Sequence, residues 1–358
     1  MKKENQKLLQ FRPVGQRGFS LVELMVASTI GLILLGGIGY VLLGSRQTFR
    51  TQDDFSRIQE NVRYALDQVG VDVRMAGYAG CLNLASIDPA NPGAAPAIGV
   101  IASNPPTVGL GDAMRGYVGT NWVTMGAPGT APANWVSGTG VFSISRASAV
   151  AVNLTGNTTP TNANIQIAGN PDNFIAGEAL LVSNCVTADL FRATTVSGGG
   201  TVTIAHSSSS NTANFTIYSY GDEAEIFRMI SNTYFIGTNP AGVPALYRQP
   251  MTGNAEEMVD NVENIVMRFG LDDGSNGGTA NDFIVDSYVD SAGVGTNWRQ
   301  VMTVRLSMVF RGNTNNIATQ VQPCVVENIA CTAAFTNTAD RRLRQVATAT
   351  FGLRNRLP

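Results

Sequence analysis

The residue types that support catalysis are scarce in this sequence of 358 residues. The one histidine, His206, precedes four consecutive serines, is expected to be a loop or strand-end residue, and has no defined acid partner for a catalytic triad. Without a second histidine, no histidine-based metal site is expected. The segment 109–114 lacks the third glycine of a dinucleotide-binding motif. The sequence therefore predicts no catalytic residues and a protein that is not an enzyme.

An Asp/Asn-rich segment, residues 271–282, is the remaining candidate for ligand chemistry. It contains Asp272 and Asp273 together with glycines and asparagines, and calcium takes about six to eight oxygen ligands of these kinds. The segment lacks the terminal glutamate of an EF-hand loop, so a hairpin turn between Phe269 and Phe283 is the alternative interpretation. If calcium binds, Asp272 and Asp273 are the best candidate ligands; otherwise no cofactor is expected.

The four cysteines are typical of a protein exported to an oxidising compartment. They are Cys81, Cys185, Cys324 and Cys331. None belongs to a Cys-x-x-Cys pair, which argues against a zinc or redox motif. Of the possible disulfide pairings we favour Cys81–Cys185 with Cys324–Cys331, because the second pair closes a short local loop. One or more free thiols in the core is the alternative.

The most informative stretch is the apolar segment 18–43, which contains one charged residue, Glu23. At ~1.5 Å per residue, a helix of this length exceeds the ~30 Å hydrocarbon core of a bilayer. A charge inside such a segment is costly and usually has a function. The preceding residues carry five cations and one anion and end in Arg17. Unlike in an ordinary secretory signal, the small residue Gly18 comes before the apolar stretch.

Residues 18–27, Gly-Phe-Ser-Leu-Val-Glu-Leu-Met-Val-Ala, resemble the prepilin leader region of the type IV filament superfamily. The resemblance implies a leader over residues 1–18, cleavage by a prepilin peptidase between Gly18 and Phe19, and methylation of the new Phe19 amino group. It also implies that Glu23 supplies the counter-charge for a neighbouring subunit's Phe19 amine. Removing one partner of a buried ion pair costs about 3–5 kcal/mol, so Glu23 is expected to select correctly docked subunits. A simple signal anchor is the alternative.

Later segments are similar to the PilW group of type IV minor pilins; they are residues 182–191, 234–237, 244–248, 262–272 and 353–356. This resemblance implies a minor pilin that helps to prime pilus assembly and is incorporated at or near the filament tip. Its partners would be the prepilin peptidase, other minor pilins, the major pilin and the assembly platform. Members at the extreme tip often lack the carboxylate, so Glu23 implies that another subunit lies above this one. The alternatives are a J-type pseudopilin of type II secretion and a pilus-presented adhesin or receptor subunit.

Charge argues against a nucleic-acid partner. The formal net charge is −2, from 24 Lys and Arg against 26 Asp and Glu. Removing residues 1–18 takes away five cations and one anion and leaves −6. Nucleic-acid binding needs clustered cations instead. The acidic pair Glu256-Glu257 is interpreted as a solvated face.

The elements that would position these residues indicate an α+β fold. Apolar residues at three- and four-residue steps predict one long helix over 19–76, with about 19–43 spanning the inner membrane. Residues 77–358 are expected to form a β-rich, loop-rich periplasmic head, which the resemblance would place on the pilus after assembly. The expected strands are 141–145, 149–154, 179–185, 201–205, 225–230, 233–236, 245–248, 265–269, 301–310 and 344–353.

Overall fold

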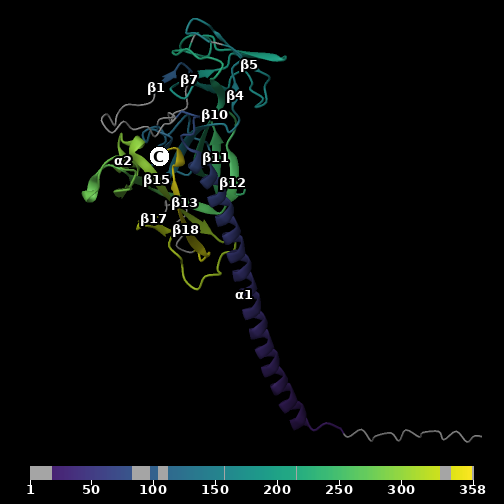
Figure 1. Cartoon of the computed structure of the whole chain (residues 1–358). Coiled ribbons are helices and arrows are strands. Elements are labelled where there is room, and N and C mark those ends of the chain that lie inside the picture. The colour runs from purple at the N-terminus through teal and green to yellow at the C-terminus, as the bar shows by residue number, and fades with distance from the viewer. Residues whose placement is uncertain are drawn as a thin grey trace, which may run out of the picture. The chain divides into compact units, whose positions relative to one another are not determined.

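The computed structural model describes residues 18–82, 97–103, 112–156, 158–214, 216–330 and 340–356. The chain divides into two compact units, residues 1–53 and 54–358. One helix, α1 (Leu21–Met75), contributes to both units, and all strands belong to the second (Figure 1). The expected α+β class, with one long N-terminal helix and a β-rich head, is confirmed.

In the first unit, α1 is apolar and exposed. Its most apolar window of 18 residues has a mean hydropathy of 2.1, and no part of that window is buried. Leu21, Leu32 and Leu43 are each about two-thirds exposed or more. By length and composition, the helix can cross a membrane.

In the second unit, one stripe of α1 is buried. Ile58, Ala65, Val69 and Val73 recur at steps of seven, four and four residues, which places them on one helix face. Gly70 lies on the same face and allows close packing, since a Cβ there would lie 2.7 Å from Cε1 of Phe351. Glycine at this position therefore brings the helix close to a strand.

The largest sheet of the described residues has nine strands and is antiparallel except for one parallel pair, β1 with β7. Its central path is β1-β7-β6-β10-β11-β12. Strands β3 and β4 also pair with β10, and β2 pairs with β3. The strands are β1 (Ala97–Val100), β2 (Met114–Tyr117), β3 (Val141–Ala147), β4 (Val152–Asn153), β6 (Ala179–Ser183), β7 (Thr187–Arg192), β10 (Glu225–Thr238), β11 (Pro244–Pro250) and β12 (Glu256–Asp260).

A second sheet has the order β14-β13-β15-β18 and is antiparallel. Its strands are β13 (Val262–Leu271), β14 (Ser287–Val289), β15 (Val301–Arg311) and β18 (Arg344–Gly352). The short helices of the head are α2 (Ser291–Val294), η1 (Ser275–Gly277), η2 (Trp298–Gln300) and η3 (Arg354–Arg356). A two-stranded hairpin, β16 (Val325–Val326) with β17 (Ile329–Ala330), packs its Val326 with Val309 of β15.

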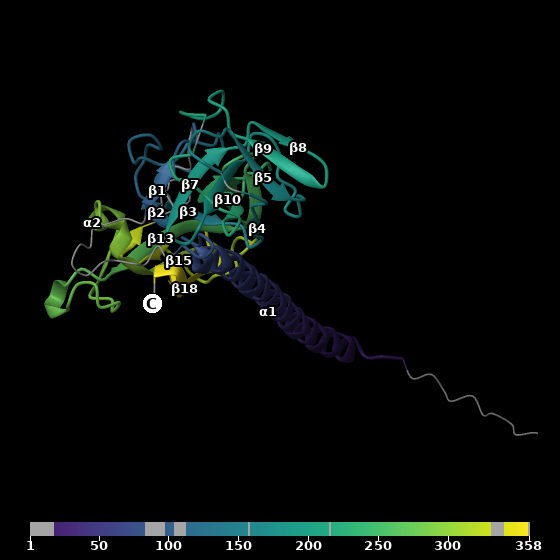
Figure 2. The same ribbon diagram turned by 45° about the horizontal axis from the view of Figure 1, so that its top comes forward.

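A third, three-stranded sheet consists of β5 (Asn164–Ala168), β8 (Thr195–Ser197) and β9 (Thr201–Ala205), which lie side by side in Figure 2. The main core joins the buried stripe of α1 to both larger sheets, through residues such as Phe142 of β3 and Phe269 of β13. A separate core lies between the third sheet and strands β6 and β7 and includes Ile165 and Phe191.

The structure differs from the expected strands in number and in length. Strands were not expected at β1, β2, β5, β7, β8, β12, β14, β16 and β17. Segments 225–230 and 233–236 form one strand, β10, because the two polar residues between them, Ser231 and Asn232, are hydrogen-bonded to Ser145 and Asp72 rather than in a turn. The expected strand 149–154 contains only the two-residue β4. By contrast, 201–205 coincides with β9. Polarity alone therefore did not predict correctly where strands continue and where they end.

Candidate functional site

The helix α1 begins with a capping motif that involves Glu23. The backbone N–H of Ser20 donates to Oε2 of Glu23 at 3.0 Å, and the N–H of Leu24 donates to the Ser20 carbonyl at 3.1 Å. Ser-x-x-Glu at a helix start is the capping-box pattern, in which the glutamate satisfies an N–H that the helix leaves unpaired. Glu23 therefore stabilises the first turn of its own helix. This role was readable from the Ser20 and Glu23 spacing and was missed.

The bond between Gly18 and Phe19 lies outside the helix. Residues 18–20 have no regular secondary structure, and the Phe19 side chain is 87% exposed. Among the described residues, its chain neighbours apart, no heavy atom lies within 4 Å of the position that a Cβ on Gly18 would take. A backbone without regular secondary structure next to a small residue is accessible to a peptidase, and the carboxylate of Glu23 is hydrogen-bonded to the N–H of Ser20, one residue after Phe19.

The second half of α1 contacts the head through a buried carboxylate, Asp72. The hydroxyl of Tyr234 donates to Oδ2 at 2.5 Å and the amide of Asn232 donates to the same oxygen at 2.7 Å. The guanidinium of Arg146 pairs with Oδ1 at 3.1 Å. Burial and the neighbouring Asp72 charge raise the pKa of Tyr234, so the phenol stays a donor. These contacts fix α1 to β10 and β3.

Two further polar contacts involve the buried half of α1. Asp54 accepts hydrogen bonds from the backbone N–H and the hydroxyl of Thr314, at 3.0 and 3.1 Å. At the other end, the amide of Asn355 donates to the carbonyls of Met75 and Ala76, at 3.3 and 3.1 Å. These carbonyls belong to the last turn, where a helix leaves acceptors unpaired. The chain's C-terminal segment thus stabilises the end of its N-terminal helix.

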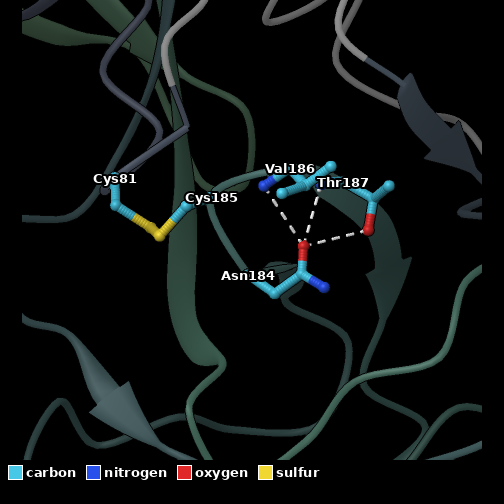
Figure 3. The surroundings of a disulfide bond; sticks show 5 residues. All are labelled: Cys81, Asn184, Cys185, Val186 and Thr187. Carbon is cyan, nitrogen blue, oxygen red and sulfur yellow. Dashed lines mark hydrogen bonds between the residues drawn. A yellow bond between two sulfur atoms is a disulfide. The ribbon is translucent and has the colours of Figure 1, made fainter.

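A disulfide follows the end of α1. Cys81 and Cys185 are bonded and lie 104 residues apart in sequence, which is the pairing that the sequence favoured (Figure 3). The side-chain oxygen of Asn184 accepts from the N–H groups of Val186 and Thr187, at 3.3 and 2.9 Å, and so shapes the turn between β6 and β7 that carries Cys185. The bond joins this turn to the segment after α1.

The second expected disulfide is only partly described. Cys324 is also disulfide-bonded and is buried. Its expected partner, Cys331, lies outside the described residues.

The aspartates of the 271–282 segment hold a loop together. The carboxylate of Asp272 is buried and accepts the backbone N–H groups of Asn281 and Phe283, at 2.6 and 2.8 Å. Asp273 accepts the N–H of Ser275, and hydrogen bonds from that residue lower the pKa of Asp273. These oxygens face N–H donors, which a cation would have to displace. Within the described residues, no group of three or more His, Cys, Asp or Glu side chains is placed to hold a metal ion.

The single histidine lies in the interior. His206 follows β9, as expected for a strand end, but its side chain is fully buried, and its ring packs on Phe191 with centroids 5.1 Å apart. Neither ring nitrogen has a hydrogen-bond partner among the described residues. Burial lowers the pKa of His206 and so favours the neutral ring. The serine run after it gave no signal of this burial.

Comparisons with known protein families match the two regions described above. Residues 233–355 match the family described as type IV pilus-assembly protein W, and this region contains β11 to β18, Tyr234 and Asn355. Residues 14–39 match the prokaryotic N-terminal methylation motif. No curated protein and no solved structure gave a match. Together, the two matches support a type IV pilus minor pilin with a prepilin-type N-terminal signal, and they are similarities over residues 233–355 and 14–39.

Proposed function

We propose that this chain is a minor pilin that helps to prime pilus assembly and is incorporated at or near the filament tip. A prepilin peptidase would remove residues 1–18 by cutting between Gly18 and Phe19, and Phe19 would then be methylated at its amino group. The observation that carries the proposal is the methylation motif over residues 14–39, at the start of an exposed helix that is long enough to cross a membrane. Residues 19–43 would anchor the subunit in the inner membrane.

Glu23 would act in docking. Once cleaved, the Phe19 amine of a neighbouring subunit would enter an apolar helix bundle, where an unpaired charge is costly. Glu23 is suited to pair with it, because its carboxylate lies at the helix start and is held by only one described hydrogen bond, from the Ser20 N–H. A charged amine is a stronger partner than a neutral N–H. Docking would therefore replace the hydrogen bond from Ser20 with an ion pair between subunits. The presence of Glu23 also suggests that a further subunit lies above this one in the filament.

The second half of α1 and the head, residues 77–358, would form the periplasmic part. Asp72 and Asn355 fix the helix to the head, so that a force on the helix is transmitted to the head. Its partners would be other minor pilins, the major pilin and the assembly platform.

A strain that lacks this gene, complemented with the wild-type chain, tests the priming role. We expect no surface pili without the chain and restored pili with it. N-terminal sequencing of the protein isolated from membranes should yield methylated Phe19 as the first residue. Recovery of Met1, or a product cut downstream of residue 44, would contradict the proposal.

A pilus-presented adhesin or receptor subunit is the second candidate. It is favoured by the part of the head that precedes the matched region, residues 97–232, which has its own sheet and its own core. Normal pili with lost adhesion in the deletion strain would support this role instead. A J-type pseudopilin of type II secretion is the third candidate, and loss of protein secretion with normal pili would support it.

A further inference from the structure

A groove lies between the second half of α1 and an edge strand. Its volume is about 550 Å³, and it is lined by Glu60, Asn61 and Tyr64 of the helix and by residues 257–260 of β12. Figure 1 shows α1 and β12 side by side. The amide of Asn61 donates to the backbone carbonyl of Asp260 at 3.3 Å and to its carboxylate at 3.0 Å, which joins the two walls at one end.

The outer edge of β12 has no partner strand among the described residues. In that part of the chain, β12 pairs with β11 alone and ends the path of the largest sheet. Asn61 covers one backbone acceptor at Asp260, and the strand continues from there to the exposed Glu257 and Glu256. An unpaired strand edge recognises an extended peptide through main-chain hydrogen bonds, and neighbouring side chains select its sequence.

Charge limits what can lie in the groove. Its lining contains three carboxylates, those of Glu60, Glu257 and Asp260, and no lysine or arginine. Pairing β12 with the same strand of a second copy would place acidic residues opposite one another, which is unfavourable. Tyr64, which is 49% exposed, and the half-buried Met258 add apolar surface. Such surface suits the aliphatic part of an arginine or lysine side chain.

We propose that this groove binds an extended segment of a neighbouring pilus subunit that carries arginine or lysine residues, added as a strand to β12. The identity of the partner as a pilus subunit depends on the proposed function, whereas the chemistry of the groove does not. Of the acidic pair Glu256-Glu257, interpreted from sequence as a solvated face, Glu257 then contributes to a docking surface. Glu256 pairs with Arg248 at 2.9 Å.

Fluorescence anisotropy with labelled peptides tests the groove on the full mature chain in detergent. The probe is a peptide of alternating arginine and valine, compared with a glutamate–valine peptide and with an arginine-rich peptide interrupted by prolines. We expect binding of the first alone, weakened by salt. The double variant Glu60→Lys with Glu257→Lys should bind it about tenfold more weakly. The control Asp222→Lys with Glu223→Lys changes the net charge equally at exposed positions and should bind as the wild type does.

Glu257 also accepts a hydrogen bond from Asn239 at 2.9 Å, so its replacement could disturb folding. Glu60→Lys alone changes an exposed helix residue and keeps the test valid if the double variant unfolds. Equal binding by wild type and Glu60→Lys would overturn the proposal, as would no binding of the arginine–valine peptide. Equal binding of the proline-interrupted peptide would also overturn it.

In cells, Glu60→Lys should reduce surface pili while the control variant assembles normally. If complete deletion of the gene leaves pili normal but the peptides bind as expected, the proposed assembly function is wrong and the proposal of a peptide-binding groove stands. If deletion abolishes pili but the peptides fail, only the groove proposal is overturned.

Discussion

The hydroxyl of Tyr234 in β10 donates a hydrogen bond of 2.5 Å to the carboxylate of Asp72 in α1, 162 residues earlier in the chain. Both side chains are buried, so this bond fixes the helix to the centre of the largest sheet. Tyr234→Phe keeps the ring, which stacks on Phe142 with centroids 4.8 Å apart, and removes only the donor. We expect a loss of about 1.5–3 kcal/mol in the free energy of unfolding, the range for hydrogen bonds to charged groups. Urea denaturation in detergent measures it, and an unchanged midpoint would contradict this role of Asp72.

A buried ion pair links β13 and β18, the two strands on either side of β15 in the second sheet. Glu263 of β13 has no exposed surface and meets Arg344 of β18 at 2.7 and 3.0 Å. Glu263→Ala should destabilise the head by about 3–5 kcal/mol, because it leaves the Arg344 charge without this partner. The double variant Glu263→Met with Arg344→Met should lose less, since both charges of this pair are removed, while Arg311 and Asp340 keep Asn261 and Arg342 as partners. Thermal unfolding of the three proteins gives the comparison, and a double variant less stable than Glu263→Ala would refute the explanation.

Stability should depend on pH through His206. Burial lowers its pKa in the folded chain below the value of about 6.5 that an exposed histidine has in the unfolded chain. Its contribution to stability is therefore fully present above about pH 6.5 and is lost as the pH falls through the folded pKa. The slope from one proton is at most about 1.4 kcal/mol per pH unit.

The variant His206→Phe, which keeps an aromatic ring beside Phe191, should have a smaller slope between pH 7 and about pH 5. Asp189, whose pKa burial raises, is present in both proteins and cancels in the comparison. Urea midpoints measured at each pH provide the slopes. Parallel slopes for the two proteins would show that His206 does not protonate on unfolding.

A glutamine substitution separates the two roles of Glu23, which are capping its own helix and pairing with the amine of a neighbouring subunit. Glu23→Gln keeps an oxygen that can accept the Ser20 N–H, but it removes the charge that a neighbouring amine requires. We expect normal cleavage after Gly18 and a strong decrease in incorporation into pili. Immunoblots of sheared pili and of membranes measure the two pools. If Glu23→Gln enters pili as efficiently as wild type, the ion-pair hypothesis fails.

Calcium should not stabilise the head. The oxygens of Asp272 accept backbone N–H groups at 2.6 and 2.8 Å, so an ion would have to break hydrogen bonds that already close the loop. We expect the same melting temperature in calcium and in a chelator, and a loss of about 1–3 kcal/mol for Asp272→Ala, because N–H groups of the loop lose their acceptor. A melting temperature that rises with calcium would restore the metal hypothesis.

Some parts of the fold followed from local pattern alone. The long helix was predictable because its apolar run and its buried stripe are contiguous in sequence and obey the helical period. The alternating residues of β15 likewise revealed a strand within one residue of its observed end. The prepilin-type start was equally visible, because Gly18, Phe19 and Glu23 lie within six residues of one another.

Other features could not be read from neighbouring residues. Asn232 looked like a break between strands, and it continues one strand because its partner Asp72 lies 160 residues away. His206 looked like a loop residue beside serines, and it is buried because β7 supplies Phe191.

The sequence by itself determined the type of N-terminus, the long helix, the β-rich class of the head and the family resemblance, since each depends on residues close together in the chain. Only the tertiary structure decided which polar groups hold the helix to the head and that the acidic loop closes on its own N–H groups. It also decided that Glu60 and Glu257 line the same groove. The physical reason is that hydrogen bonds and burial depend on distances in space, and the pairs that matter here are separated by up to 280 residues.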